Sequence, residues 1–357
     1  MKKILYLFFV FLNLNAELVL EITESSDNPY RIAIHDFDGQ ALISNEISSI
    51  IKADLQRTGE FSVLSSDELL AEETYQEELN YKNYRLLGVD YILKGIIDSK
   101  DEMNITVSYD IYDSVKEKKI RSSKIYGIPN KTRQLAHYVS DGIYEEITGL
   151  KGVSSTKMLY VSEGLAGSAK VYKLMLADAD GMNEQTLLKS NSAIISPSWS
   201  PDSKDIAYVS FETGLAKVFI QNIATGSREV AVKNKYQISS PAFSPDGKFL
   251  SLTLYQDGNA EIYILNLENK NLTRLTNHYS IDTESSWSPD GKKILFTSGR
   301  SGSPQLYEID LLKFNTKIII CKTIRLKNSL AYSSRNNLLQ ITEIDKASKI
   351  SKKLKYF

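Results

Sequence analysis

The stretch PSWSPDSKDIAYVS at residues 197–210 has two near copies later in the chain. PAFSPDGKFLSLTL begins at residue 241 and SSWSPDGKKILFTS begins at residue 285, so the copies start 44 residues apart. In each copy an aromatic residue precedes a Ser-Pro-Asp turn, and a short apolar run follows it. Proline presets φ at the second turn position, and Asp-Gly or Asp-Ser allows a tight reversal. A period of about 40 to 50 residues indicates a solenoid, a propeller or another repeat array.

Every copy continues into the same order of predicted strands. The turn is followed by IAYVS (206–210), LSLTL (250–254) or ILFTS (294–298), and a second apolar run then completes a hairpin. KMLYVS (157–162) and KVYKLMLADADG (170–181) supply the same two strands before the first copy. Several short strands per repeat predict the blades of a β-propeller. We expect the recurring aromatic residues to fill the space between blades: Trp199, Phe243 and Trp287.

The preceding segment, residues 29–152, mixes strand and helix patterns and predicts a small α/β domain. YRIAIHDF (30–37) is typical of a buried strand, and MNITVSYDIYD (103–113) alternates like a strand with one buried face. Apolar residues at helical spacing predict helices near 42–59 and 132–150. The fold class predicted is therefore an α/β N-terminal domain followed by a β-propeller.

The first 16 residues, MKKILYLFFVFLNLNA, have the layout of a secretory signal peptide. Two lysines precede an apolar core, and Ala16 is a small residue before the expected cleavage point. Cleavage would leave residues 17–28 as an N-terminal tail, and it predicts an exported chain. With 42% hydrophobic and 24% charged residues, the chain is typical of globular proteins. Its formal charge of −1 gives no support for nucleic-acid binding.

Motifs for catalysis, metals and cofactors are weak. The only histidines are far apart in sequence, which favours core or surface roles: His35, His137 and His278. GRSGS (299–303) lacks the glycine spacing of a nucleophile elbow, and LADADG (176–181) has leucine at the first ligand position of a calcium loop. The single Cys321 excludes an intramolecular disulfide and a cysteine-based zinc cluster. The sequence therefore predicts no catalytic residue, no metal and no cofactor.

The sequence of the chain resembles that of the TolB family, which are periplasmic proteins of the Tol–Pal envelope system. The resemblance runs from about Glu17 to Leu311, and these stretches carry it: IIKADLQRTGEFSVL (50–64), LGVDYILKGII (87–97), ITGLKGV (147–153), MLYVS (158–162), IISPSWSPDSKDIAYVSFETG (194–214) and SSPAFSPDGK (239–248). It implies a six-bladed propeller and a non-enzymatic periplasmic scaffold. Such a scaffold would link inner-membrane TolA to the outer-membrane lipoprotein Pal, for envelope integrity and outer-membrane constriction at cell division. The resemblance also implies a monomer, free of a membrane span once the signal is removed, among peptidoglycan-associated proteins.

The resemblance assigns TolA binding to the first residues of the mature chain: Glu17, Leu18, Val19, Leu20, Glu21, Ile22 and Thr23. Such a segment can extend another protein's sheet, or it can be a structural first strand of its own domain. Pal binding is assigned to loops before the Ser-Pro-Asp turns: Gln237, Ser239, Ser240, Thr283 and Glu284. Thr283 and Glu284 match the family's Thr-Glu pair, whereas Gln237 replaces a frequent histidine and Ser240 a frequent alanine. The alternative for these residues is ordinary solvated loops.

After Leu311 the resemblance fades. No Ser-Pro-Asp occurs near residue 333, although SLAYSSR (329–335) has the pattern of a blade strand, and residues 313–357 hold eleven basic and two acidic residues. A divergent last blade with a basic edge strand, or a truncated or frame-shifted C-terminus, would each explain this pattern. Residues 153–357 are therefore expected to form four recognisable blades and an incomplete fifth. The alternative functions are an exported propeller hydrolase or lyase and a peptide-binding propeller; an acidic or histidine cluster in the channel would favour catalysis.

Overall fold

The computed structural model describes residues 28–69, 74–99, 104–256, 258–313, 316–319, 330–332 and 339–341. The chain divides into two compact units. Residues 1–97 and 108–123 form the first unit, and residues 98–107 and 124–357 form the second. The predicted signal peptide and the predicted TolA-binding segment lie outside the described residues. Among the residues that are described, no helix is both long and apolar enough to cross a membrane.

The N-terminal part is built on a five-stranded sheet in the order β2-β1-β3-β4-β5. Its strands are β1 (Tyr30–Ile34), β2 (Phe61–Val63), β3 (Tyr91–Asp98), β4 (Ile105–Asp113) and β5 (Lys118–Gly127). Strand β1 runs parallel to both of its neighbours. The helices are α1 (Ala41–Arg57), α2 (Tyr81–Leu86) and α3 (Thr132–Thr148), with short 3₁₀ turns η1 (Ser66–Glu68) and η2 (Pro129–Lys131). These elements confirm the predicted mixture of strands and helices.

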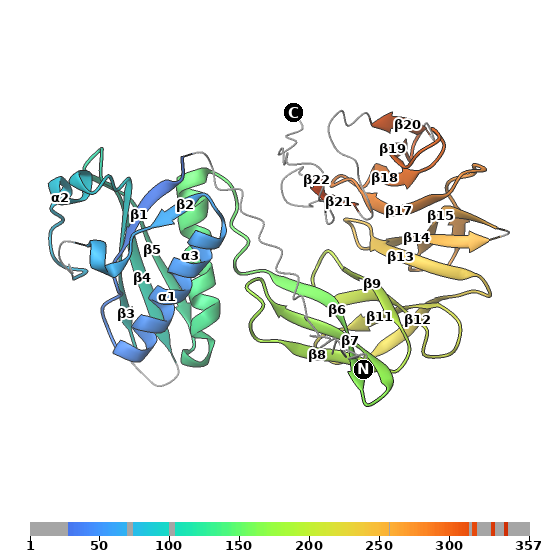
Figure 1. The fold of residues 1–357 in the computed structure, drawn as a ribbon, viewed down its shortest axis with the longest axis horizontal. Coiled ribbons are helices and arrows are strands. Elements are labelled where there is room, and N and C mark those ends of the chain that lie inside the picture. The colour runs from blue at the N-terminus through green and yellow to red at the C-terminus, as the bar shows by residue number, and fades with distance from the viewer. Residues whose placement is uncertain are drawn as a thin grey trace, which may run out of the picture. The chain divides into compact units, whose positions relative to one another are not determined.

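The repeats form antiparallel sheets, which we call blades one to four (Figure 1). Blade one comprises β6 (Lys157–Ala166), β7 (Ala169–Asp178) and β8 (Gln185–Ser190). Blade two comprises β9 (Ile194–Trp199), β10 (Asp205–Ser210), β11 (Lys217–Asn222) and β12 (Arg228–Lys233). Blade three comprises β13 (Gln237–Phe243), β14 (Phe249–Gln256), β15 (Asn259–Asn266) and β16 (Leu272–Arg274). Blade four comprises β17 (Asp282–Trp287), β18 (Lys293–Ser298), β19 (Gln305–Asp310) and β20 (Thr316–Ile319).

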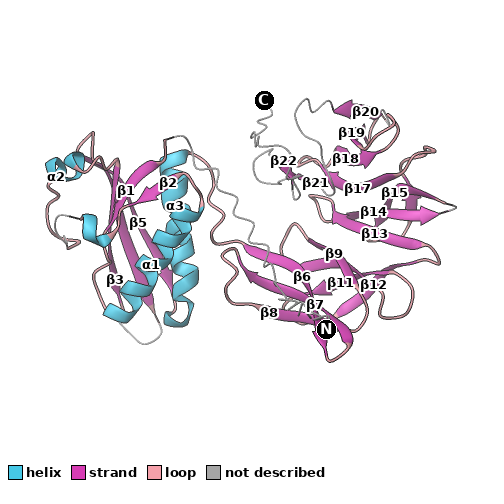
Figure 2. Cartoon of the chain, in the orientation of Figure 1, coloured by secondary structure: helices cyan, strands magenta, loops and turns pink. Residues whose placement is uncertain are grey.

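A further two-stranded sheet pairs β21 (Leu330–Tyr332) with β22 (Leu339–Ile341). The strands β9, β13 and β17, which begin blades two to four, contact one another in that order. Figure 2 shows that the described helices all lie outside the repeats. Within the described residues the sheets do not close into a ring, so the prediction of an α/β domain and an incomplete propeller is confirmed.

The recurring Ser-Pro-Asp turn has the same internal hydrogen bonds in blades two, three and four. In blade three the Ser244 hydroxyl donates to Asp246 Oδ1 at 2.6 Å, and Lys248 N–H donates to the same oxygen at 3.1 Å. Phe249 N–H donates to Ser244 Oγ at 2.9 Å and closes the turn. The serine hydrogen bond is the main reason that the pKa of Asp246 lies below its usual value. The equivalent bonds start from Ser200 and Ser288. This bonding explains why serine and aspartate recur at a fixed spacing on either side of the proline.

Apolar residues from adjacent blades pack together behind these turns. Trp287 of β17 is 7% exposed and packs in one cluster with Ile262 of blade three and Phe296 of blade four. Its indole Nε1–H donates to the Ala242 carbonyl at 3.0 Å. The expected role of the repeated aromatic residue between blades is therefore confirmed at Trp287. Trp199, at the matching position in blade two, is only partly buried.

Candidate functional site

The first strands of blades two, three and four each contain a β-bulge at the same place. In each of these blades the pairing between the first and second strands shifts register at one place. On the first strand, this place is at Ser196, Ser240 or Glu284. Those three residues have φ values of 52°, 51° and 56°, and they lie 44 residues apart. A residue other than glycine held at positive φ costs on the order of 1–3 kcal/mol, and such residues cluster at binding sites and switches. A bulge also redirects the neighbouring side chains.

Four of the residues assigned to partner binding lie at two of these bulges. Ser239 and Ser240 lie on β13, and Thr283 and Glu284 lie on β17. Because β13 and β17 contact one another, the structure brings the two pairs into one region. Gln237 is exposed at the start of β13. The prediction that these residues belong to loops is wrong: they lie on paired strands, and the bulge breaks the alternation that marks a strand in sequence.

A buried group of charged residues lies directly beside the β17 bulge. Asp282, the first residue of β17, is fully buried, and its Oδ2 accepts from Arg300 Nη2 at 2.5 Å. Burial raises the pKa of the Asp282 carboxyl, and the charge of Glu261 adds to this, while the Ser298 hydroxyl and Arg300 oppose it. Glu261 is itself 3% exposed and accepts from Arg274 at 2.8 Å. The start of β17 is thus held in the blade by an ion pair.

Sequence reasoning missed this charged group, although the sequence contained a signal for it. Glu261 stands between Ala260 and Ile262 in an otherwise apolar strand pattern. All three residues are buried in the structure. A carboxylate in such a position must be paired with a donor, because burying an unpaired charge is costly.

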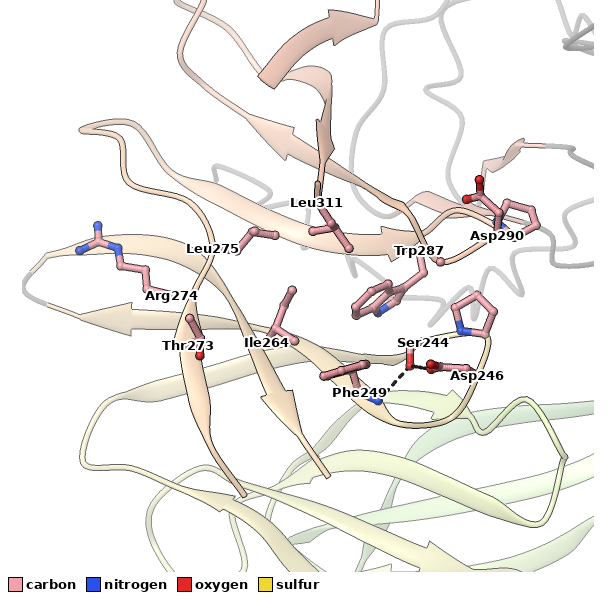
Figure 3. Close-up of a pocket in the computed structure, with 13 residues that line it drawn as sticks. Ser244, Asp246, Phe249, Ile264, Thr273, Arg274, Leu275, Trp287, Asp290 and Leu311 are labelled. Atoms are coloured by element: carbon pink, nitrogen blue, oxygen red, sulfur yellow. Dashed lines mark hydrogen bonds between the residues drawn. The ribbon is translucent and has the colours of Figure 1, made fainter. Parts of the chain in front are cut away.

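A pocket of about 560 Å³ lies between blades three and four, on the side of the Ser-Pro-Asp turns (Figure 3). Its apolar lining comes from both blades and comprises Phe249, Ile264, Leu275, Trp287 and Leu311. Asp246 and Asp290 lie at its turn end, and none of the five residues assigned to Pal binding lines it. A smaller pocket of about 390 Å³ occupies the matching place between blades two and three. There, Lys270 Nζ lies 3.1 Å from Glu229 Oε1. The larger pocket is therefore a feature of blade packing and separate from the bulges.

Two of the three histidines, His35 and His137, are buried among other protein groups. His35 Nε2 lies 2.7 Å from the Tyr84 hydroxyl, and both side chains are buried. Among the described residues, His137, Asp178 and Asp180 form one group with potential metal-ligand atoms within 4.8 Å of one another. Arg133 is paired with Asp180, and Lys157 with Asp178, so protein cations already accompany both carboxylates.

Comparison with known proteins identifies the class to which the two domains of this chain belong. Residues 18–120 match the TolB amino-terminal domain, and residues 144–354 match the TolB β-propeller domain. The crystal structure of TolB from Acinetobacter baumannii superposes with a TM-score of 0.82 at 35% identity, covering 92% of this chain and 80% of that one. The fold is therefore that of an α/β domain joined to a propeller of TolB type. The chain belongs to the TolB family.

Curated relatives agree with this assignment over part of their length. The Tol-Pal system protein TolB of Alcanivorax borkumensis is 42% identical over 215 residues, which cover 60% of this chain and 49% of that protein. The protein of the same name from Bordetella avium is 38% identical over 214 residues, or 60% of this chain and 47% of that protein. The chain spans about half the length of these relatives.

Proposed function

We propose that this chain is a non-enzymatic periplasmic scaffold of the Tol–Pal system. It would connect TolA of the inner membrane to the lipoprotein Pal of the outer membrane, and so support envelope integrity and constriction at cell division. Membership of the TolB family supports the proposal. The observation that carries it is the pair of neighbouring bulges on β13 and β17, which hold the residues assigned to Pal.

The side chains at the two bulges suit binding to a folded partner. Ser239, Ser240 and Thr283 offer hydroxyl groups, Gln237 an amide and Glu284 a carboxylate. Hydroxyl and amide groups both donate and accept, so this surface can pair with backbone groups and with a basic side chain of Pal. Membership of the TolB family favours a scaffold over the alternative of a propeller hydrolase or lyase.

Replacing Glu284 with glutamine is expected to weaken Pal binding about tenfold, because hydrogen bonds to charged groups contribute about 1.5–3 kcal/mol. Glutamine keeps the size of the side chain, so the bulge is retained. The measurement is calorimetric titration of the full mature chain with the soluble domain of Pal. Glu268→Gln is the matched control, because Glu268 is an exposed carboxylate of the neighbouring blade three and lies outside both bulges. Equal Pal affinity of wild type and Glu284→Gln would remove Glu284 from the site.

Deleting residues 17–23 from the mature chain is expected to abolish TolA binding and to leave Pal binding intact. A short extended segment of alternating apolar residues can bind by adding a strand to the partner's sheet. The measurement is a pull-down of wild type and deletion variant with separate TolA and Pal domains, together with thermal unfolding. A variant that still binds TolA as wild type does would overturn this assignment. A large fall in Tm with both partners lost would instead favour a structural first strand.

A further inference from the structure

The bulge of β17 lacks a constraint that the two preceding bulges share. Ser196 is followed by Pro197 and Ser240 by Pro241, whereas Glu284 is followed by Ser285. Proline fixes its own φ, and so limits the conformations open to the strand immediately after the bulge. Serine imposes no such limit. The backbone that follows Glu284, whose own φ is 56°, therefore lacks this restriction and depends more on its other contacts.

Two hydroxyl groups of blade three contact the β17 bulge across the seam, by which we mean the boundary between two adjacent blades. Glu284 N–H donates to Thr253 Oγ1 at 3.3 Å, and the same oxygen lies 3.4 Å from Thr283 Oγ1. The Ser285 hydroxyl donates to Ser251 Oγ at 2.9 Å. Ser251 and Thr253 both lie on β14, and both are fully buried. Thr253 thus touches both residues of the Thr-Glu pair from the neighbouring blade.

The seam between blades two and three provides an internal comparison. The residues 44 positions before Ser251 and Thr253 are Ala207 and Val209, which are buried on β10 and carry no hydroxyl group. At the seam between blades two and three, Pro241 therefore occurs together with apolar residues of the neighbouring blade. At the seam between blades three and four, Ser285 occurs together with buried hydroxyl groups.

We propose that Thr253 is a positioning residue for the partner-binding site, taking the place of the missing proline by holding Glu284 N–H and the Thr283 side chain. The proposal rests on the proposed function, in which Thr283 and Glu284 contact Pal. A bulge without this hydrogen bond would sample other backbone conformations, and binding would then carry the entropy cost of ordering them. Thr253 acts through its neighbours, because its own side chain is fully buried.

The first test needs no partner. Amide hydrogen exchange is measured at Glu284 in the full mature chain for wild type, Thr253→Val and Thr253→Ser. Valine is close to threonine in size and is the residue that blade two has at this position, whereas serine keeps the hydroxyl group. Losing one hydrogen bond should speed exchange about 3–10-fold in Thr253→Val, while Thr253→Ser stays within about twofold of wild type. Unchanged exchange in Thr253→Val would overturn the proposal.

A second variant, with a smaller side chain at position 253, tests the proposal even if valine disturbs the packing of the core. Thr253→Ala also removes the hydroxyl group but adds no bulk, so it should give the same faster exchange at Glu284. Thr213→Val is the matched control, because it makes the same chemical change at an exposed turn of blade two and should leave exchange unchanged. Normal protection of Glu284 in Thr253→Ala would also count against the positioning role.

The second test measures affinity for the soluble domain of Pal by calorimetric titration. Thr253→Val is expected to bind about 5–10-fold more weakly, and Thr253→Ser within about twofold of wild type, as expected for one hydrogen bond. If wild type binds and Thr253→Val binds equally well, Thr253 has no positioning role. If wild type does not bind Pal, the proposed function fails, and the exchange experiment still decides whether Thr253 fixes the bulge.

Discussion

Replacing Trp287 with alanine is expected to destabilise the propeller by about 3–5 kcal/mol, the usual cost of truncating a large buried aromatic side chain. The indole is 7% exposed and stacks near Phe249 with ring centroids 6.4 Å apart. Its hydrogen bond to the Ala242 carbonyl would also be lost. Because the pocket of about 560 Å³ borders the indole, water can reach part of the space left behind. The expected loss of folding free energy is therefore closer to about 3 kcal/mol than to about 5 kcal/mol.

Trp199→Ala is the matched comparison, because Trp199 holds the same position in blade two but is only partly buried. Its loss of stability should be less than half that of Trp287→Ala. Denaturant unfolding followed by tryptophan fluorescence measures both, since the chain has two tryptophans and each variant keeps one. A loss below about 1 kcal/mol for Trp287→Ala would contradict its burial between the blades.

Replacing Arg300 with alanine is expected to cost about 3–5 kcal/mol at pH 7, because it leaves a buried carboxylate without its cation. Asp282 is fully buried and pairs with Arg300 at 2.5 Å. The guanidinium also lies 5.3 Å from the ring centroid of Phe296 and 4.9 Å from that of Tyr307, and those contacts would be lost as well. Calorimetric unfolding of the variant at several pH values is the measurement.

The pH dependence of this loss identifies its cause. Burial raises the pKa of Asp282, so the folded state binds this proton more tightly than the unfolded chain does, and the contribution of Asp282 to stability becomes more favourable as the pH falls through its folded-state pKa. Removing Arg300 strengthens that effect. The cost of Arg300→Ala should therefore shrink as the pH falls from about 7 toward the unfolded-state pKa of an aspartate, about 3.9. Asp282→Asn combined with Arg300→Ala should recover much of the stability and remove the pH dependence. A cost that stays constant with pH would point to the aromatic contacts alone.

The blades could be predicted from sequence because the Ser-Pro-Asp turn is a local structure. Its hydrogen bonds join residues two to five positions apart, so the motif is visible in a single repeat. The N-terminal domain followed equally from local strand and helix patterns. The prediction placed Thr283 and Glu284 in a loop, because a bulge with polar residues resembles a loop when only alternation is considered.

Contacts between residues far apart in sequence, within a blade or between blades, were not visible to the same reasoning. Arg300 reaches Asp282 over 18 positions, and Thr253 reaches Glu284 over 31, so both contacts depend on how strands and blades stack. Comparing equivalent repeat positions offers a partial remedy. The change from Pro241 to Ser285 coincides with the change from Val209 to Thr253, and such paired departures indicate contact across a seam.

The order in which the blades contact one another has a consequence for unfolding. Contacts between successive sheets run from β6 to β9, from β9 to β13, from β13 to β17 and from β17 to β21, so each described sheet of the repeats contacts the next one along the chain. In such a nearest-neighbour array, stability is the sum of blade terms and interface terms, and a terminal unit can separate while the middle stays folded. Cooperativity is then set by the weakest seam. Denaturation should proceed inward from an end blade, with blades two and three retaining slow amide exchange longest.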